Sequence, residues 1–63
     1  MEYKIKESRE KAGISQEQLS KTAGVSRAII SGLENGTITV TTTKTLSKIA
    51  EALGVKVSDI FLS

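Results

Sequence analysis

The 63-residue sequence contains no cysteine and no histidine, and these absences exclude several classes of protein. A disulfide framework, a zinc finger and a catalytic Cys–His pair each need one or both of these side chains. The seven Asp and Glu residues do not have the spacing of a metal-ligand set, and the sequence has no glycine-rich phosphate loop. We therefore expect no metal, no other cofactor and no enzymatic activity.

Long hydrophobic runs are missing as well. The apolar stretches are no longer than three residues, which excludes a membrane-spanning helix and a signal peptide. A chain of this length buries only about 60% of the surface that it exposes when unfolded, so a single domain over residues 1–63 with a small core is expected. Such a domain has no room for a small-molecule ligand. These features favour a cytoplasmic protein that does not bind membranes.

Positive charge is in slight excess and is unevenly placed. The net charge is +2, and residues 1–31 contain six Lys and Arg against four Asp and Glu. Residues 32–63 contain three of each sign, so the whole excess lies in the first half. This distribution is a weak indication of an anionic partner.

Apolar residues recur at helical spacing along the chain, as in Leu46, Ile49, Ala50 and Leu53. Glycine follows the end of four such patterns, where a left-handed backbone ends a helix at low cost. The threonine-rich stretch at 37–45 has β propensity, but it is short and lies between two helical patterns, so we interpret it as a loop. The sequence thus predicts an all-α fold with helices over residues 2–12, 16–23, 26–35, 42–53 and 57–62.

Two of the predicted helices are joined by a very short turn. The first begins at a capping box formed by Ser15 and Gln18, and Gly24 lies in the turn to the second. So tight a turn makes the helices cross steeply, at about 90–120°, and leaves the N-terminal end of the second helix projecting. A projecting helix fits the major groove of B-DNA. The same spacing is also compatible with a generic helical hairpin.

Two stretches of the chain resemble the Cro/cI-type (XRE-like) helix-turn-helix family of phage and bacterial regulators: ISQEQLSKTAGVSRAIISGLENG and LSKIAEALGVKVSDIF. The match runs from Arg9 to Phe61, and its specific pieces are SQEQL, GVSR, LENG and IAEALGV in this order. The resemblance implies a compact five-helix, lambda-repressor-like domain with its helix-turn-helix at about residues 16–35.

The function implied by the resemblance is sequence-specific binding to double-stranded DNA by a small transcriptional regulator. We expect a nucleoid-associated repressor of bacterial or phage origin. The alternative is a protein-interaction module, such as an antitoxin-like regulator, built on the same fold.

Seven residues are predicted to contact DNA: Gln16, Ser26, Arg27, Ala28, Ser31, Gly32 and Thr37. In the family Gln16 typically contacts a phosphate or a base, and otherwise it is a solvent-exposed neighbour of a helix cap. Arg27 either bonds guanine O6 and N7 with both arms of its guanidinium or clamps a phosphate. Ser26 caps the second helix and can also meet a phosphate. Ala28 offers a methyl contact to thymine, and Ser31 a hydroxyl for a base edge or phosphate.

Three features depart from the family pattern. Ile29 stands where a polar residue is often found, and it either joins the core or touches DNA. Gly32 stands where many relatives have a long polar side chain, and it either lets the helix approach the DNA backbone closely or reflects drift on an exposed face. The following loop has no positive charge before Lys44, so hydroxyl groups such as those of Thr37 and Thr39 are its available donors.

The resemblance also implies two features outside the DNA surface. Arg9 and Glu34 form an ion pair in the family that joins the first helix to the end of the second helix of the helix-turn-helix. Relatives commonly dimerise through their C-terminal part, so Val57, Phe61 and Leu62 are candidates for the interface of a homodimer on a palindromic operator. The other interpretation of Phe61 is that it closes the core of the monomer.

Overall fold

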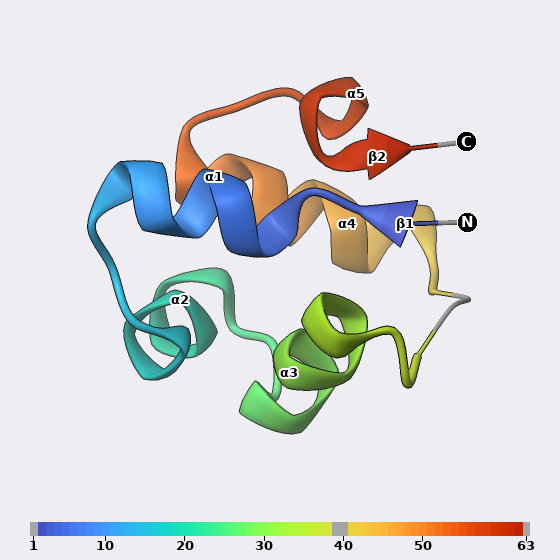
Figure 1. The fold of residues 1–63 in the computed structure, drawn as a ribbon. Helices are drawn as coiled ribbons and strands as arrows, with labels where there is room; N and C mark the ends of the chain where they lie inside the picture. The colour runs from blue at the N-terminus through green and yellow to red at the C-terminus, as the bar shows by residue number, and fades with distance from the viewer. Residues whose placement is uncertain (1, 39–40, 63) are drawn as a thin grey trace.

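Five short helices surround one apolar core in the computed structural model, which describes residues 2–38 and 41–62 (Figure 1). The helices agree in number and order with the predicted all-α fold, and the middle three begin within about a residue of their expected positions. None of the helices in these ranges is both long and apolar enough to cross a membrane. The elements are α1 (Ile5–Ala12), α2 (Gln16–Ala23), α3 (Arg27–Asn35), α4 (Thr43–Leu53) and α5 (Val57–Ile60).

The two ends of the chain pair with each other as very short strands, which the sequence analysis did not predict. β1 (Glu2–Tyr3) and β2 (Phe61–Leu62) are antiparallel, with Tyr3 opposite Phe61 (Figure 1). The rings of Tyr3 and Phe61 meet edge to face, with centroids 5.7 Å apart. Two residues per strand carry no periodicity, so only the meeting of the two distant segments reveals the pairing.

The pairing shortens the first and last helices relative to their predicted ranges of 2–12 and 57–62. The backbone N–H of Lys4 donates to the carbonyl of Ile60 at 2.8 Å, which places the end of α5 beside the start of α1. The start of α5 also differs from the starts of α2, α3 and α4, because the lysine at its N-cap position has no side-chain atom that could accept a hydrogen bond. Instead the carboxylate of Asp59 accepts from the backbone N–H of Lys56 at 2.9 Å.

Three helices, α2, α3 and α4, begin at side-chain caps that the chain supplies locally, and Ser26 is the cap of α3. Ser15 Oγ accepts from the backbone N–H of Gln18 at 3.1 Å at the start of α2. Thr42 Oγ1 accepts from the backbone N–H of Thr45 at 3.1 Å at the start of α4. Each bond satisfies one of the N–H groups that a helix leaves without an internal partner, so these starts are encoded within a few residues.

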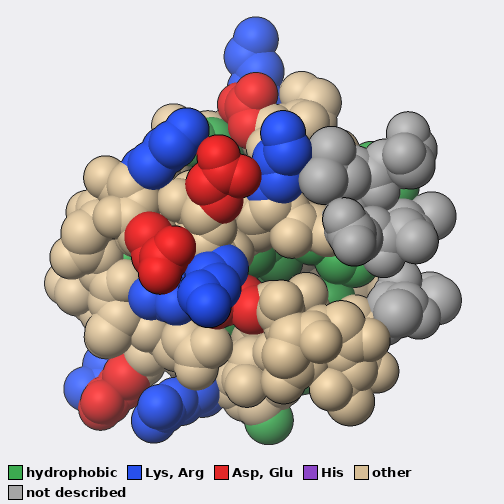
Figure 2. Space-filling model, viewed as in Figure 1, with side chains coloured by type: hydrophobic (Ala, Val, Ile, Leu, Met, Phe, Trp, Pro, Cys, Tyr) green, Lys and Arg blue, Asp and Glu red, His purple; other side chains and the backbone are tan. Residues whose placement is uncertain are grey.

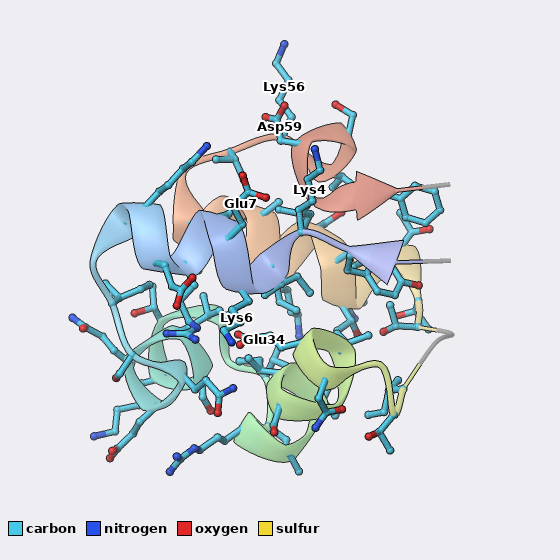
Figure 3. All side chains as sticks on the ribbon, viewed as in Figure 1. Lys4, Lys6, Glu7, Glu34, Lys56 and Asp59 are labelled. Atoms are coloured by element: carbon cyan, nitrogen blue, oxygen red, sulfur yellow. The ribbon has the colours of Figure 1, made fainter. Side chains whose placement is uncertain are left out.

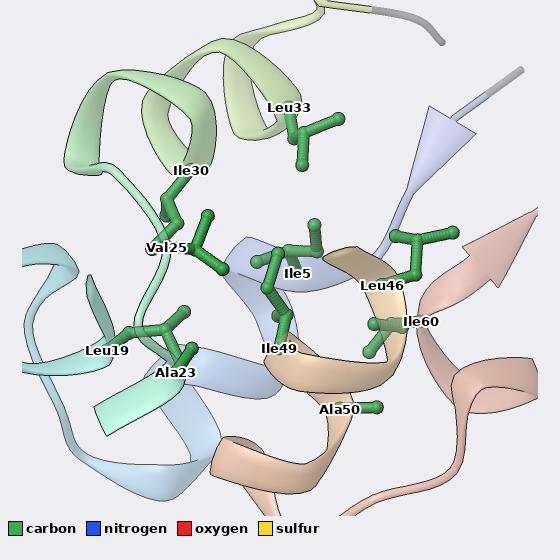
Figure 4. Close-up of a cluster of buried hydrophobic side chains, with 10 residues drawn as sticks. All are labelled: Ile5, Leu19, Ala23, Val25, Ile30, Leu33, Leu46, Ile49, Ala50 and Ile60. Atoms are coloured by element: carbon green, nitrogen blue, oxygen red, sulfur yellow. The ribbon is translucent and has the colours of Figure 1, made fainter. Parts of the chain in front are cut away.

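The core contains side chains from all five helices (Figure 4). Five of them are completely buried, one from each helix, so every helix is tied to the same apolar centre. This shared burial packs α2 and α3 against α1 and α4. The buried residues are Ile5, Leu19, Ala23, Val25, Ile30, Leu33, Leu46, Ile49, Ala50 and Ile60.

Candidate nucleic-acid interface

The turn between α2 and α3 is held by hydrogen bonds that converge on one serine. Ser20 Oγ donates to the carbonyl of Val25 at 2.6 Å, and the Ser20 carbonyl accepts from the backbone N–H groups of Gly24 and Val25. Gly24 has φ of 67°, a left-handed conformation that is unfavourable for other residues. Val25 is buried, so the turn is anchored in the core. Ser20 could not be recognised from the sequence, because its hydroxyl finds the Val25 carbonyl only after the chain has turned.

The N-terminal half of α3, with its cap, presents four of the seven residues that were predicted to contact DNA. Ser26, Arg27 and Ala28 are exposed, and Ser31 is partly exposed. Ser26 Oγ accepts from the backbone N–H of Ala28 at 3.2 Å, so the predicted cap is present. Arg27 and Ser31 lie four residues apart and therefore share one face of α3. None of the ion pairs found within residues 2–38 and 41–62 involves Arg27.

An ion pair joins α1 to the last turn of α3, as the resemblance implies. Arg9 Nε lies 2.9 Å from Glu34 Oε2, and Arg9 Nη2 lies 3.1 Å from Glu34 Oε1, so the pair is bidentate. The third nitrogen, Nη1, donates to the carbonyl of Ile14 at 2.9 Å. The side chains are only 14% and 4% exposed. A planar, partly buried guanidinium with three bonds thus holds α3 at one angle to α1.

Gln16 is part of the same hydrogen-bond network. Its Nε2 donates to Glu34 Oε1 at 3.1 Å, so the amide at the first turn of α2 is attached to α3. Glu34 therefore connects α1, α2 and α3. The sequence predicts roles for Gln16 and Glu34 separately but not this contact, because eighteen positions separate the two residues and no local signal relates them. The contact of Gln16 with DNA stays a prediction.

Charge is unequally distributed over the face shown in Figure 2. Lys, Arg, Asp and Glu side chains gather toward α1, α2 and α5, whereas the surface over α3 consists largely of neutral side chains. Two of the lysines face acidic partners on their own helices: Lys11 lies 3.6 Å from Glu7, and Lys21 lies 3.6 Å from Glu17. Arg27 is thus a positive charge without such a partner among the described residues, at the end of a largely neutral helix.

These features, a projecting α3 with an exposed arginine and a turn anchored in the core, are those of a helix-turn-helix. A family model described as helix-turn-helix matches residues 5–60. This chain belongs to the helix-turn-helix family. It is a DNA-binding transcriptional regulator of the XRE type. It is 38% identical over 61 residues to the uncharacterized HTH-type transcriptional regulator YgzD of Bacillus subtilis (strain 168), an overlap that covers 97% of this chain and 91% of that protein.

Gly32 of this regulator has a different role from the predicted one. It is buried, because the side chain of Ile38 lies over it: a Cβ atom at position 32 would be 2.5 Å from Ile38 Cδ1 and 2.6 Å from Cγ1. The prediction that Gly32 contacts DNA is therefore wrong, and so is its interpretation as drift on an exposed face. The contact of Ile38 with Gly32 could not be predicted from the sequence, because Ile38 lies in a threonine-rich loop that carries no regular pattern.

The remaining departures from the family pattern are also placed by the structure. Ile29 is partly buried and packs against the core, as one of its two interpretations predicts. Thr37 is exposed, and its backbone N–H bonds to Asn35 Oδ1 at 2.9 Å. Thr39 lies outside the described residues.

The C-terminal residues lie at the end of the molecule opposite α3 (Figure 1). Val57 and Phe61 are partly buried and pack against the core, and Phe61 also contacts Tyr3. Of Leu62 only the backbone is described. A homodimer interface at these residues stays a prediction.

The network around Glu34 also sets its ionisation. Burial by itself would raise the pKa of the Glu34 carboxyl, but hydrogen bonds from Arg9 and Gln16, with the charges of Arg9 and Lys6, outweigh burial and hold that pKa below its ordinary value. Figure 3 shows Lys6 and Glu34 close together between α1 and α3. The hydrogen bond to Glu34 in turn raises the pKa of Arg9 above its ordinary value, so both partners are charged over the physiological range.

Acid is therefore expected to destabilise the fold through Glu34. Because its pKa is lower in the folded than in the unfolded chain, its contribution is fully present above the unfolded value of about 4.3 and is lost as the pH falls through the folded value. Urea unfolding between pH 6 and pH 2.5 should show a steeper acid decline for the native chain than for Glu34→Gln. Glu51→Gln, an exposed change on α4, is the matched control. Equal declines in the native chain and Glu34→Gln would contradict this account.

Proposed function

We propose that this regulator is a repressor that binds a palindromic operator as a homodimer, with α3 of each protomer in the major groove. The observation that carries the proposal is the exposed Arg27 at the N-terminal end of a helix whose angle is set by the Arg9–Glu34 pair. A helix held this firmly needs no further ordering of its backbone on binding, so the entropy lost here is mainly that of the Arg27 side chain. The protein acts by binding in the cytoplasm, without catalysis.

Base reading is assigned to the exposed first half of α3. Arg27 reaches guanine O6 and N7, Ala28 contacts a thymine methyl group, and Ser31 bonds a base edge from the next turn. Gln16 and the first backbone N–H groups of α2 lie on a phosphate, where the helix dipole favours negative charge. The attachment of Gln16 to Glu34 supports this assignment, because it fixes the amide beside α3.

Dimerisation and repression follow from the size of the reading surface. One helix reads only a few base pairs, and two protomers related by a two-fold axis read two half-sites about one helical turn apart. Val57 and Phe61, at the end of the domain away from α3, offer apolar surface for the second copy. Occupying an operator is sufficient to block transcription, whereas activation needs a further contact to the transcription machinery.

The test is selection from a pool of randomised duplexes, followed by a reporter assay. We expect an enriched inverted repeat that binds two protomers, and lower expression from a promoter that carries it. An enriched site without two-fold symmetry, or one that binds a single protomer, would contradict the dimer, and higher reporter expression would contradict repression. If no site is enriched and binding merely fades as salt rises, the regulator is not sequence-specific under these conditions and a protein partner becomes the better candidate.

The salt dependence of binding should be shallow and should depend on Lys44. Lys44 is exposed in the first turn of α4, directly after the loop that follows α3. If it contacts a phosphate, Lys44→Ala should reduce the slope of log K against log salt by about 0.9 per protomer. Lys56→Ala is the control, since Lys56 lies at the end of the molecule away from α3 (Figure 3). Equal slopes of log K against log salt for the native chain and Lys44→Ala would show that Lys44 does not contact a phosphate.

A further inference from the structure

The loop after α3 folds back onto the helix and is attached to it at three places. Gly36 ends α3 with φ of 85°, which reverses the chain direction. The backbone N–H of Thr37 then donates to Asn35 Oδ1 at 2.9 Å, and the backbone N–H of Ile38 donates to the carbonyl of Gly32 at 2.9 Å. The third attachment is the side chain of Ile38, which covers Gly32 and packs against the core.

The contact between Ile38 and Gly32 leaves no room for a side chain at position 32. Besides the two overlaps already described, a Cβ atom there would lie 3.3 Å from Ile38 Cβ. Rotating χ2 moves only Cδ1, so relief of the overlap with Cγ1 needs a change of χ1 that lifts the Ile38 side chain off α3, or a shift of the loop. Glycine inside a helix costs roughly 1 kcal/mol relative to alanine. This cost of a glycine in the middle of α3 is offset here, because Gly32 leaves space for the Ile38 side chain to pack on the helix and hold the loop. We call this packing of Ile38 on Gly32 the seat of the loop.

We propose that Gly32 and Ile38 are positioning residues of the DNA interface: Ile38 seated on Gly32 holds the exposed Thr37 beside α3, where its hydroxyl donates to a DNA phosphate. The proposal rests on the proposed function, and it adds a phosphate-binding element to it. Phosphates run along the edges of the groove that α3 enters, and an element fixed beside that helix meets them in one register. The Thr37 backbone N–H is already bonded to Asn35, so the hydroxyl is the donor.

A role of Gly32 and Ile38 in positioning Thr37 can be separated from a role in folding. The test measures how much the effect of Thr37→Val on DNA binding changes when either residue is substituted. The selected duplex is titrated with the native chain, Thr37→Val, Gly32→Ala, Ile38→Ala and the two double variants that add Thr37→Val to each seat variant. A hydrogen bond to a charged group contributes about 1.5–3 kcal/mol, so Thr37→Val should weaken binding about 12- to 160-fold per half-site in the native background. In the Gly32→Ala and Ile38→Ala backgrounds the same change should weaken binding less than about 1.5-fold, because the loop no longer holds Thr37 at the phosphate.

Two further measurements keep the outcomes distinct. Thermal unfolding reports the stability of each variant, and Ile38→Ala, which leaves α3 unchanged, carries the test if Gly32→Ala does not fold. A Thr37→Val effect that is absent in the native chain, or equal in all backgrounds, overturns the positioning role. Arg27→Ala is titrated in parallel. If it abolishes specific binding while the Thr37 effects are merely additive, only this inference fails; if the native chain selects no site, the proposed function fails with it.

Discussion

Arg9→Ala is expected to lower the free energy of unfolding by about 3 kcal/mol, because the nearly buried carboxylate of Glu34 would lose its bidentate partner. A 63-residue domain has a total stability of only about 3–9 kcal/mol, so the variant should lose a third or more of it and unfold at a clearly lower urea concentration than the native chain. The loss also removes the bond from Arg9 to the Ile14 carbonyl, which holds the turn between α1 and α2. Urea unfolding followed by circular dichroism measures the change.

Two further variants separate the charge from the packing. Arg9→Ala combined with Glu34→Gln should recover part of the loss, since a neutral amide costs less to bury than an unpaired carboxylate. Lys21→Ala removes an exposed ion pair with Glu17 and should cost less than about 0.5 kcal/mol. If Arg9→Ala costs as little as Lys21→Ala, the Arg9–Glu34 pair does not orient α3.

Arg27→Ala is expected to weaken binding to the selected operator by about 1–3 kcal/mol per half-site, and by twice that amount for a dimer. Its stability should equal that of the native chain, because Arg27 is exposed and forms none of the ion pairs seen in the described ranges. Titrations of the selected duplex and of a shuffled duplex measure the effect. A loss confined to the selected duplex identifies base reading, and an equal loss on both duplexes identifies a phosphate clamp.

Arg27→Lys is the matched control for this prediction. It keeps the charge but cannot form two parallel bonds to guanine, so it should bind the shuffled duplex like the native chain and lose affinity for the operator. Native affinity of Arg27→Ala for the selected operator would show that α3 does not read bases through this residue.

The helix-turn-helix could be predicted because its signals are local. The cap at Ser15, the cap at Ser26 and the turn at Gly24 each act within a few residues, and helical spacing marks the apolar faces between them. The Arg9–Glu34 pair came from the resemblance to a family rather than from spacing. The exposed residues at the start of α3 followed from the same unit, since a tight turn leaves that end of the helix projecting.

The tertiary structure decided which segments contact each other where no local sequence pattern relates them. The pairing of β1 with β2, the bond from Gln16 to Glu34, and Ile38 over Gly32 each join residues from different elements. The sequence alone determined where α2 to α5 begin and which face of each helix is apolar, because those properties depend on neighbours within one turn. It did not determine that Gly32 is buried by a loop rather than open to DNA, because that depends on where the chain goes after Gly36 and on the space that the packed core leaves for it.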